Sequence, residues 1–161
     1  MVSRKNLKKL QTQRPKGLSR LLLLARRNFV VELGALIEKS GLPPMPDSCA
    51  MLLPHIDLEG TRSTDIAHRA GLSKQAVTQM ISHMEALQLV EKKTDPTDAR
   101  ATLVSFTDFG TAYLIHMHAI IDQVEDDIRS RVGDERMAEL RSLLDFMAYE
   151  WPSQTGRKTG T

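Results

Sequence analysis

The sequence lacks the features on which disulfide-stabilised and membrane-spanning proteins depend. Cys49 is the only cysteine among 161 residues, which excludes an internal disulfide and an all-cysteine metal cage. The apolar run at residues 21–25 is far shorter than the roughly 20 residues that a membrane helix needs. A lone cysteine suits a reducing compartment. We therefore expect a cytoplasmic protein with no membrane contact.

Motifs for catalysis and metal binding are also missing. The chain has no glycine-rich phosphate loop, nucleophile elbow or His-Glu-x-x-His arrangement. His116 and His118 are two positions apart and would point to different sides of a helix, a poor geometry for chelation. The acidic run 125–127 fits a solvated helix surface, and Cys49 fits a packed core thiol better than a redox switch. We expect no enzymatic activity, no cofactor and no metal site.

Acidic residues are absent from the first 31 positions, which hold nine of the 22 Lys and Arg residues. The remainder of the chain carries all 20 acidic residues, so the net charge of +2 hides a strong asymmetry. Such a basic segment either touches a polyanion or is a solvated tail. Because no helical stripe is visible before Pro15 and Gly17, we predict a flexible basic arm over 1–17, with order beginning near Leu18, and a disordered tail over 152–161.

Three segments have the apolar periodicity of helices that flank a central domain. The first, 18–40, ends at Gly41 and Pro43, and the second, 108–131, has Thr107 as its cap. The last, 135–150, is expected to bury Met137, Leu140, Leu144 and Met147. The first helix is apolar over so much of its circumference that a small monomer could hardly cover it. We therefore predict a helical dimerisation region over 18–44 and 107–151.

The central segment has the pattern of a helix-turn-helix. A helix over 47–56 should be kinked or shortened by Pro54, and a short helix over 64–70, with Ser63 or Thr61 as its cap, is closed by Gly71. Ser73 then caps a helix over 74–87. Its apolar face consists of Val77, Met80, Ile81, Met84 and Leu87, and its polar face of Gln75, Thr78, Gln79 and Ser82.

Two short runs of strand character, 90–94 and 101–106, follow this helix and are separated by a turn-rich segment, 95–100. A hairpin after such a helix is a wing. The predicted fold is mainly α with a small β-hairpin, a winged helix-turn-helix domain over 45–106.

These motifs resemble the MarR family of winged-helix regulators. The resemblance rests on Thr64-Asp65-Ile66-Ala67, Leu72-Ser73, Val77-Thr78, Leu87, Leu89-Val90, Asp98-Ala99-Arg100, Val104 and Thr107-Asp108-Phe109-Gly110. The order and spacing of the motifs agree with the family over about residues 45–131. The long flanking helices resemble the dimerisation helices of the family and extend the resemblance to 18–150. The sequence departs from the family at Thr97 and Ala99, where basic residues are frequent, and at Pro54, which interrupts a helix that usually continues.

The polar face of the helix over 74–87 supplies the expected DNA contacts. Gln75, Thr78 and Gln79 are the candidates for reading base edges, and Ser82 shares their face. Ser73 and Lys74, at the start of the helix, would position a phosphate. Lys92 and Lys93 are expected phosphate contacts. The resemblance implies that Arg100 enters the minor groove and that Asp98 holds it by a salt bridge.

The function that this resemblance implies is sequence-specific regulation of transcription. The expected partners are a second copy of the chain, duplex DNA with a pseudo-palindromic operator, and a small aromatic or phenolic effector that releases a repressor. A winged-helix dimer that acts by docking to proteins is an alternative, and an architectural DNA binder without sequence preference is a third. Ligand-binding residues cannot be assigned from the sequence.

Overall fold

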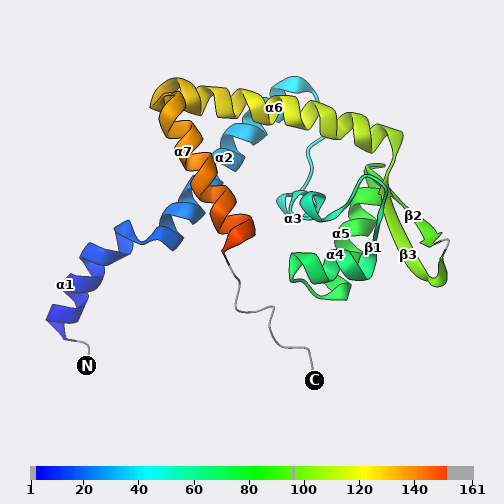
Figure 1. Ribbon diagram of the computed structural model, residues 1–161, viewed down its shortest axis with the longest axis horizontal. Helices are drawn as coiled ribbons and strands as arrows, with labels where there is room; N and C mark the ends of the chain where they lie inside the picture. The colour runs from blue at the N-terminus through cyan, green and yellow to red at the C-terminus, as the bar shows by residue number, and fades with distance from the viewer. Residues whose placement is uncertain (1–2, 96, 152–161) are drawn as a thin grey trace. The chain divides into compact units, whose positions relative to one another are not determined.

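The computed structural model describes residues 3–95 and 97–151, apart from the side chains of Lys5, Ala99 and Arg100. It divides into two compact units, Met1–Ile120 and Ile121–Thr161 (Figure 1). None of the described helices is long and apolar enough to cross a membrane. The elements in chain order are α1 (Arg4–Gln13), η1 (Arg14–Lys16), α2 (Leu18–Ser40), α3 (Asp47–Ala50), η2 (Leu53–His55), β1 (Thr61–Arg62), α4 (Ser63–Ala70), α5 (Lys74–Ala86), β2 (Val90–Asp95), β3 (Asp98–Phe106), α6 (Asp108–Val132), α7 (Asp134–Asp145) and η3 (Phe146–Glu150).

The N-terminal segment contains a helix that the sequence analysis does not predict. Residues 4–13 form α1, and a single 3-10 turn containing Pro15 follows it. The segment has only two apolar positions, Leu7 and Leu10, so no stripe is visible, but it is built from good helix formers and contains neither glycine nor proline. Regular structure therefore begins at Arg4 and not near Leu18 as expected, whereas the flexibility predicted for residues 1–17 stays a prediction.

The first long helix, α2, is confirmed with the predicted bounds. It ends at Gly41, whose φ of 75° is the left-handed conformation that a glycine adopts without strain. None of its residues is fully buried in the single chain, and Leu18, Leu21, Leu23 and Val31 are at least half exposed. The helix thus presents an apolar surface that its own chain leaves open.

The helix-turn-helix is confirmed, with corrections at its start. The helix predicted over 47–56 stops at Ala50, and Pro54 lies in a separate 3-10 turn, as expected from its missing backbone donor. Neither Thr61 nor Ser63 caps α4: Ser63 is its first residue, and Arg62 occupies the cap position without a side-chain hydrogen bond. Gly71, with φ 66°, ends α4.

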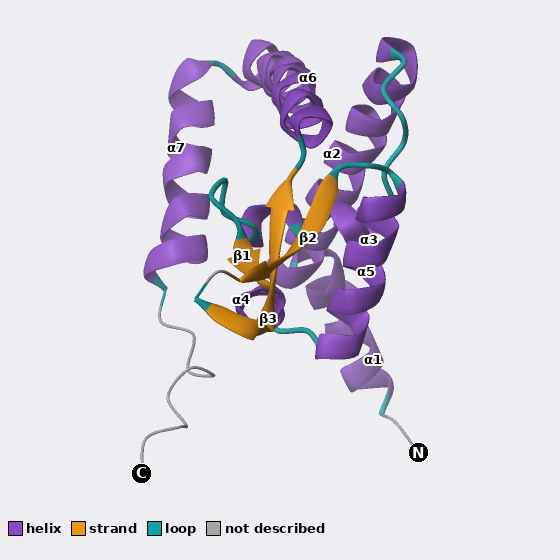
Figure 2. Ribbon diagram, turned by 90° about the vertical axis from the view of Figure 1, so that its right-hand side faces the viewer, coloured by secondary structure: helices purple, strands orange, loops and turns teal. Residues whose placement is uncertain are grey.

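The wing is a hairpin in a three-stranded antiparallel sheet with the strand order β1-β3-β2 (Figure 2). The register pairs Val90 with Phe106 and Lys92 with Val104. Both predicted strands form, and each is longer than predicted, so the turn is shorter than 95–100. Strand β1 was not predicted, because two residues are too few to show the alternation of a strand.

The core of the domain gathers apolar side chains from α3, α4, α5 and the sheet. The fully buried ones are Cys49, Leu52, Ile66, Val77, Ile81, Met84 and Val104. The thiol of Cys49 lies 3.7 Å from the carbonyl oxygen of Met80, and burial raises its pKa. A raised pKa disfavours the reactive thiolate. The interpretation of Cys49 as a packed core thiol is therefore confirmed.

The beginning of α6 is fixed to the backbone that leads into the wing. Thr107 caps α6 as predicted: its Oγ1 accepts from the amide of Gly110 at 2.8 Å and donates to the carbonyl of Gln88 at 2.5 Å. The amide of Thr107 donates to the carbonyl of Leu89 at 3.2 Å. A Cβ on Gly110 would overlap that carbonyl oxygen and lie 2.7 Å from the carbonyl carbon. Only glycine permits this approach.

A second tie joins α6 to the loop after α2. The hydroxyl of Tyr113 donates to the carbonyl of Pro43 at 3.0 Å, and the tyrosine side chain is only 2% exposed. Burial raises the pKa of this phenol, so it stays a protonated donor. The bond spans 70 residues of sequence and holds the proline-rich connector against α6.

The second unit holds the end of α6 together with α7. Arg141 on α7 forms an ion pair with Glu125 on α6. Met137 is buried as predicted, and Met147 is partly buried. Leu140 and Leu144 are 46% and 42% exposed, so their predicted burial is wrong for the single chain. The periodicity correctly places these leucines on one face of α7, but nothing in the described part of this chain covers that face.

We predict that Gly110→Ala lowers the free energy of unfolding by about 2 kcal/mol or more, because the methyl group must displace the Leu89 backbone. Urea denaturation followed by circular dichroism measures this. Gly34→Ala in α2 is the matched control: no atom lies within 4 Å of the position that a Cβ would take there, and helix propensity favours alanine by about 0.5–1 kcal/mol. Equal stability of the two variants would contradict the prediction.

Candidate nucleic-acid interface

Helix α5 carries the predicted DNA-reading residues on one exposed face. Gln75, Thr78, Gln79 and Ser82 are all exposed, and their spacing places them along one side of the helix. The opposite side, with Val77, Ile81 and Met84, is buried in the core. The core contacts therefore orient the polar face outward.

The start of α5 is held by Ser73, whose Oγ accepts a hydrogen bond from the amide of Ala76 at 3.2 Å. This cap satisfies one of the free amides of the first turn and leaves others open to an anion. Lys74, the first residue of the helix, is exposed beside them. The structure is therefore consistent with a phosphate-positioning role for this turn.

The polar side chains of this face differ in whether their hydrogen-bonding groups are already used. The Thr78 hydroxyl donates to the carbonyl of Lys74 at 2.8 Å, and the Ser82 hydroxyl accepts from Lys92 at 3.1 Å. Within the described part of the chain, the amides of Gln75 and Gln79 have no partner. A glutamine amide can donate and accept at once, as reading an adenine edge requires. The two glutamines are the strongest candidates for base recognition.

The wing lysines are brought near this face but are already paired. Lys92 lies 2.5 Å from a carboxylate oxygen of Glu85 on α5, and Lys93 lies 2.6 Å from Glu91. Both pairs are solvent-accessible, so each contributes about 1 kcal/mol or less and can be exchanged for a phosphate. The electrostatic gain on binding DNA is reduced by the cost of breaking the pair.

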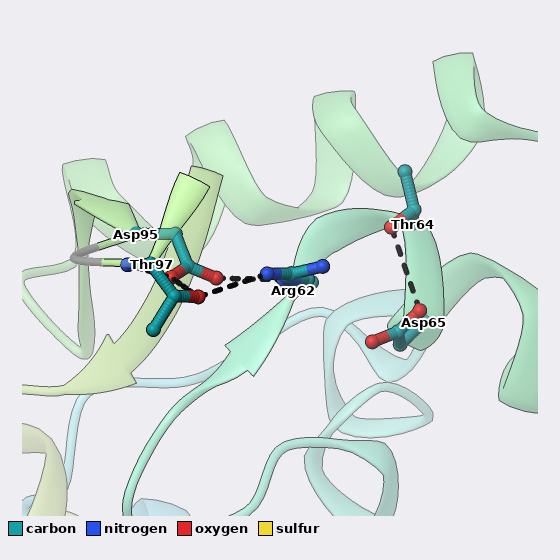
Figure 3. Close-up of polar contacts among 5 residues, drawn as sticks. All are labelled: Arg62, Thr64, Asp65, Asp95 and Thr97. Carbon is teal, nitrogen blue, oxygen red and sulfur yellow. Dashed lines mark hydrogen bonds and ion pairs between the residues drawn. The ribbon is translucent and has the colours of Figure 1, made fainter. Parts of the chain in front are cut away.

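A polar cluster that the sequence analysis missed fixes the turn of the wing (Figure 3). The Arg62 guanidinium on β1 donates to Asp95 Oδ2 at 2.6 Å and to Thr97 Oγ1 at 3.2 Å. Asp95 Oδ1 accepts from the Thr97 amide at 2.8 Å and from the Thr97 hydroxyl at 2.6 Å. We call Arg62, Asp95 and Thr97 the wing clamp. It connects the strand before α4 to the turn of the hairpin.

The wing clamp has strong electrostatic character. The hydrogen bonds from Thr97, then that from Arg62, hold the pKa of Asp95 well below its usual range. Asp95 in turn raises the pKa of Arg62, with a smaller contribution from the charge of Asp98. The Asp95 side chain is only 7% exposed, so its charge needs these partners. The spacing of Asp95 and Thr97 is typical of an Asx turn and could have been noticed in the sequence. No local pattern indicates that Arg62 joins them.

The predicted contacts at the wing tip are only partly described. Asp98 begins β3, and its negative charge acts on Arg62. Arg100 also belongs to β3, but its side chain lies outside the described residues, so its predicted salt bridge with Asp98 stays a prediction. Thr97, one of the positions at which the sequence departs from the expected family pattern, is part of the wing clamp.

A second small cluster secures the loop before β1. Asp57 accepts from Arg69 on α4 at 2.8 Å and from the Thr61 hydroxyl at 3.0 Å, and these bonds lower its pKa. The amide of Asp57 donates back to Thr61 Oγ1 at 2.8 Å. No three His, Cys, Asp or Glu side chains among the described residues come together as a metal site.

The sequence profile of the MarR family matches residues 40–101, from the last residue of α2 into β3. The regulator TcaR of Staphylococcus aureus (strain Newman), described as an HTH-type transcriptional regulator, is 26% identical over 109 residues, 66% of this chain and 72% of TcaR. The central part of the chain is thus similar to the MarR family. This family consists of transcriptional regulators rather than enzymes.

Solved structures of other regulators share the fold of this chain. The repressor CouR, bound to a 23-mer DNA duplex, superposes with a TM-score of 0.68 at 22% identity, covering 83% of this chain and 94% of CouR. NadR in complex with 4-hydroxyphenylacetate superposes with a TM-score of 0.63 at 19% identity, covering 83% of this chain and 93% of NadR. The predicted winged-helix fold is thus confirmed.

We predict that Asp95→Asn lowers the melting temperature at neutral pH, because Arg62 loses its charged partner. The native state holds the pKa of Asp95 below its unfolded value, so its stabilisation is present above about pH 4 and is lost as the pH falls further. The variant should therefore show a shallower loss of stability than the native chain between about pH 4 and pH 2. Thermal unfolding across this range measures both effects, and Asp122→Asn, on the exposed side of α6, is the control. Parallel curves for native chain and Asp95→Asn would refute the prediction.

Proposed function

We propose that the chain is a MarR-family transcriptional regulator that binds a specific duplex operator through α5 and the wing. The observation that carries the proposal is the outward face of α5, on which the amides of Gln75 and Gln79 are unpartnered within the described residues. A helix fits the major groove, where amide side chains can distinguish base pairs by their donor and acceptor pattern. CouR, with the same fold, has a solved structure bound to a 23-mer DNA duplex.

The wing supplies the accompanying backbone contacts. Lys74, Lys92 and Lys93 bind phosphates, the two wing lysines after exchanging their carboxylate partners. Arg100 enters the minor groove, whose negative potential attracts a guanidinium, and Asp98 orients it. The wing clamp holds the hairpin at a fixed angle to α4, so that wing and α5 meet the duplex together.

The functional species is a homodimer. Helix α2 exposes Leu18, Leu21, Leu23 and Val31, and α7 exposes Leu140 and Leu144. Apolar surface of this extent favours burial by about 25 cal/mol per Å². A second copy related by twofold symmetry would place two α5 helices in successive major grooves about 34 Å apart, which implies a pseudo-palindromic operator.

Repression is relieved by a small aromatic or phenolic acid. NadR, which shares the fold, was crystallised with 4-hydroxyphenylacetate. Since both α5 helices must fit the same operator, an effector that binds better to another spacing of the helices weakens both contacts at once. The alternative, a dimer that acts by docking to proteins, has no support from the relatives, which are transcriptional regulators.

We predict that Gln75→Ala and Gln79→Ala each weaken operator binding by roughly 5- to 150-fold, corresponding to about 1–3 kcal/mol for one base contact. The probe is labelled DNA from upstream of the protein's own gene, with random duplex as competitor. Gln123→Ala, exposed on α6, is the matched control and should bind as the native chain does. Two chains should be present per bound operator.

The outcomes of this experiment separate the candidate functions. Saturable, competitor-resistant binding that disappears in the glutamine variants supports the proposal. Binding that random duplex removes with equal efficiency would identify an architectural protein. Absence of binding at low salt would overturn a DNA function and favour the docking alternative.

We predict that aromatic acids release the preformed operator complex. Titration with 4-hydroxyphenylacetate and benzoate, with acetate as the control that carries a carboxylate but no ring, should shift the apparent Kd for DNA by roughly 5- to 150-fold, the usual range of coupling between two sites. No change with any aromatic acid up to millimolar concentration would contradict the proposed class of effector while leaving DNA binding intact.

A further inference from the structure

The N-terminal helix has charges that the winged helix does not use. Residues 4–16, which comprise α1 and η1, contain six Lys and Arg residues and no acidic residue. The described basic side chains of this segment, Arg4, Lys8, Lys9, Arg14 and Lys16, are all exposed. None of them contacts a carboxylate within the described residues. The segment is therefore a concentrated and uncompensated source of positive charge.

The winged-helix domain shows the opposite arrangement. Its arginines and lysines are largely engaged within the chain: Arg62 pairs with Asp95, Arg69 with Asp57, Lys92 with Glu85 and Lys93 with Glu91. Binding of duplex DNA gains affinity from each phosphate that a free cation neutralises. A domain in which four cations are already paired gains less from each of them, so free cations outside it would add to the affinity.

The geometry of α1 sorts its residues by type. Arg4 and Lys8 are four positions apart and lie above one another, and Lys9 lies about 100° further around the helix. Leu7 and Leu10 lie on the other side, where they line a hollow with Arg14, Pro15 and Arg20. The apolar side is thus turned toward the start of α2, and the basic side is turned away from it.

The charges of α1 oppose its own formation. The first turn has no acidic residue, and Arg4 and Lys8 repel each other at i and i+4. Each such effect costs a few tenths of a kcal/mol in an isolated helix. A polyanion along the basic side would remove both penalties.

We propose that α1 binds the phosphate backbone of duplex DNA through Arg4, Lys8 and Lys9 and so enlarges the contact made by the winged helix. This inference rests on the proposed function. A ten-residue helix spans about 15 Å, an axial length over which a duplex carries roughly nine phosphate charges. An anionic membrane fits the helix less well, because its apolar side has only Leu7 and Leu10 and no aromatic residue.

The test compares two double variants of the full chain that remove the same charge. Lys8→Gln/Lys9→Gln neutralises the basic side of α1, and Lys39→Gln/Arg136→Gln neutralises two exposed cations of α2 and α7 that also lack carboxylate partners in the described structure. The Kd for a 40-base-pair random duplex is measured from 50 to 300 mM KCl. The α1 variant should lower the slope of log K against log salt by about 0.9 for each phosphate that is no longer neutralised, and should weaken binding roughly tenfold or more at 0.1 M.

The outcomes distinguish this inference from the proposed function. If the native chain binds duplex and both double variants show the same slope of log K against log salt as the native chain, the role of α1 is overturned and the proposed function stands. If the two variants lose affinity equally, the effect is one of net charge and the inference also falls. If the native chain binds no duplex, both fall. If the α1 variant binds duplex as the native chain does but no longer binds vesicles with 30% phosphatidylserine, α1 is assigned to membranes and the inference is overturned.

Discussion

The contact between the first turn of α6 and the backbone at Leu89 constrains the whole winged-helix domain. The carbonyl of Leu89 accepts from the Thr107 amide, and Gly110 allows the helix to approach it without a side chain between them. Gln88, the residue before, adopts a left-handed conformation with φ 59°, which costs a non-glycine residue of order 1 kcal/mol or more, and its carbonyl is bonded to the Thr107 hydroxyl. Because α5 ends at Ala86 and β2 begins at Val90, this one junction sets the directions of α5, the wing and α6.

The polar contacts of the domain fall into two groups with different energetic roles. The wing clamp combines a largely buried carboxylate with three hydrogen-bond donors, so removing one partner leaves a charge without compensation. The pairs of Lys92 and Lys93 lie at the surface and exchange partners at little cost. The first group determines the shape of the wing, and the second sets how much positive charge on the wing stays unpaired.

The sequence predicted the elements whose signals are local. Gly71 and Ser73 mark the ends of two helices, Thr107 marks the start of α6, and the alternation around residues 90–106 marks the hairpin. The predictions from the sequence that failed did so for physical reasons. Helix α1 has too few apolar residues for a stripe, β1 is too short for a period, and Arg62 reaches a residue 33 positions away that no local pattern connects to it. The exposure of Leu140 and Leu144 could not be read from periodicity, which identifies an apolar face but not what covers it.

The bond between Tyr113 and Pro43 has a bearing on how the chain acquires its fold during synthesis. It joins residues 70 positions apart, and the entire helix-turn-helix and wing lie between them. Closing so long a loop requires that the start of α6 has already left the ribosome, so the connector after α2 cannot be secured while the wing is being made. At a synthesis rate of about 5–20 residues per second, the segment from Pro43 to Tyr113 takes several seconds to appear. The bond between Tyr113 and Pro43 therefore forms only after the helix-turn-helix and the wing have been synthesised.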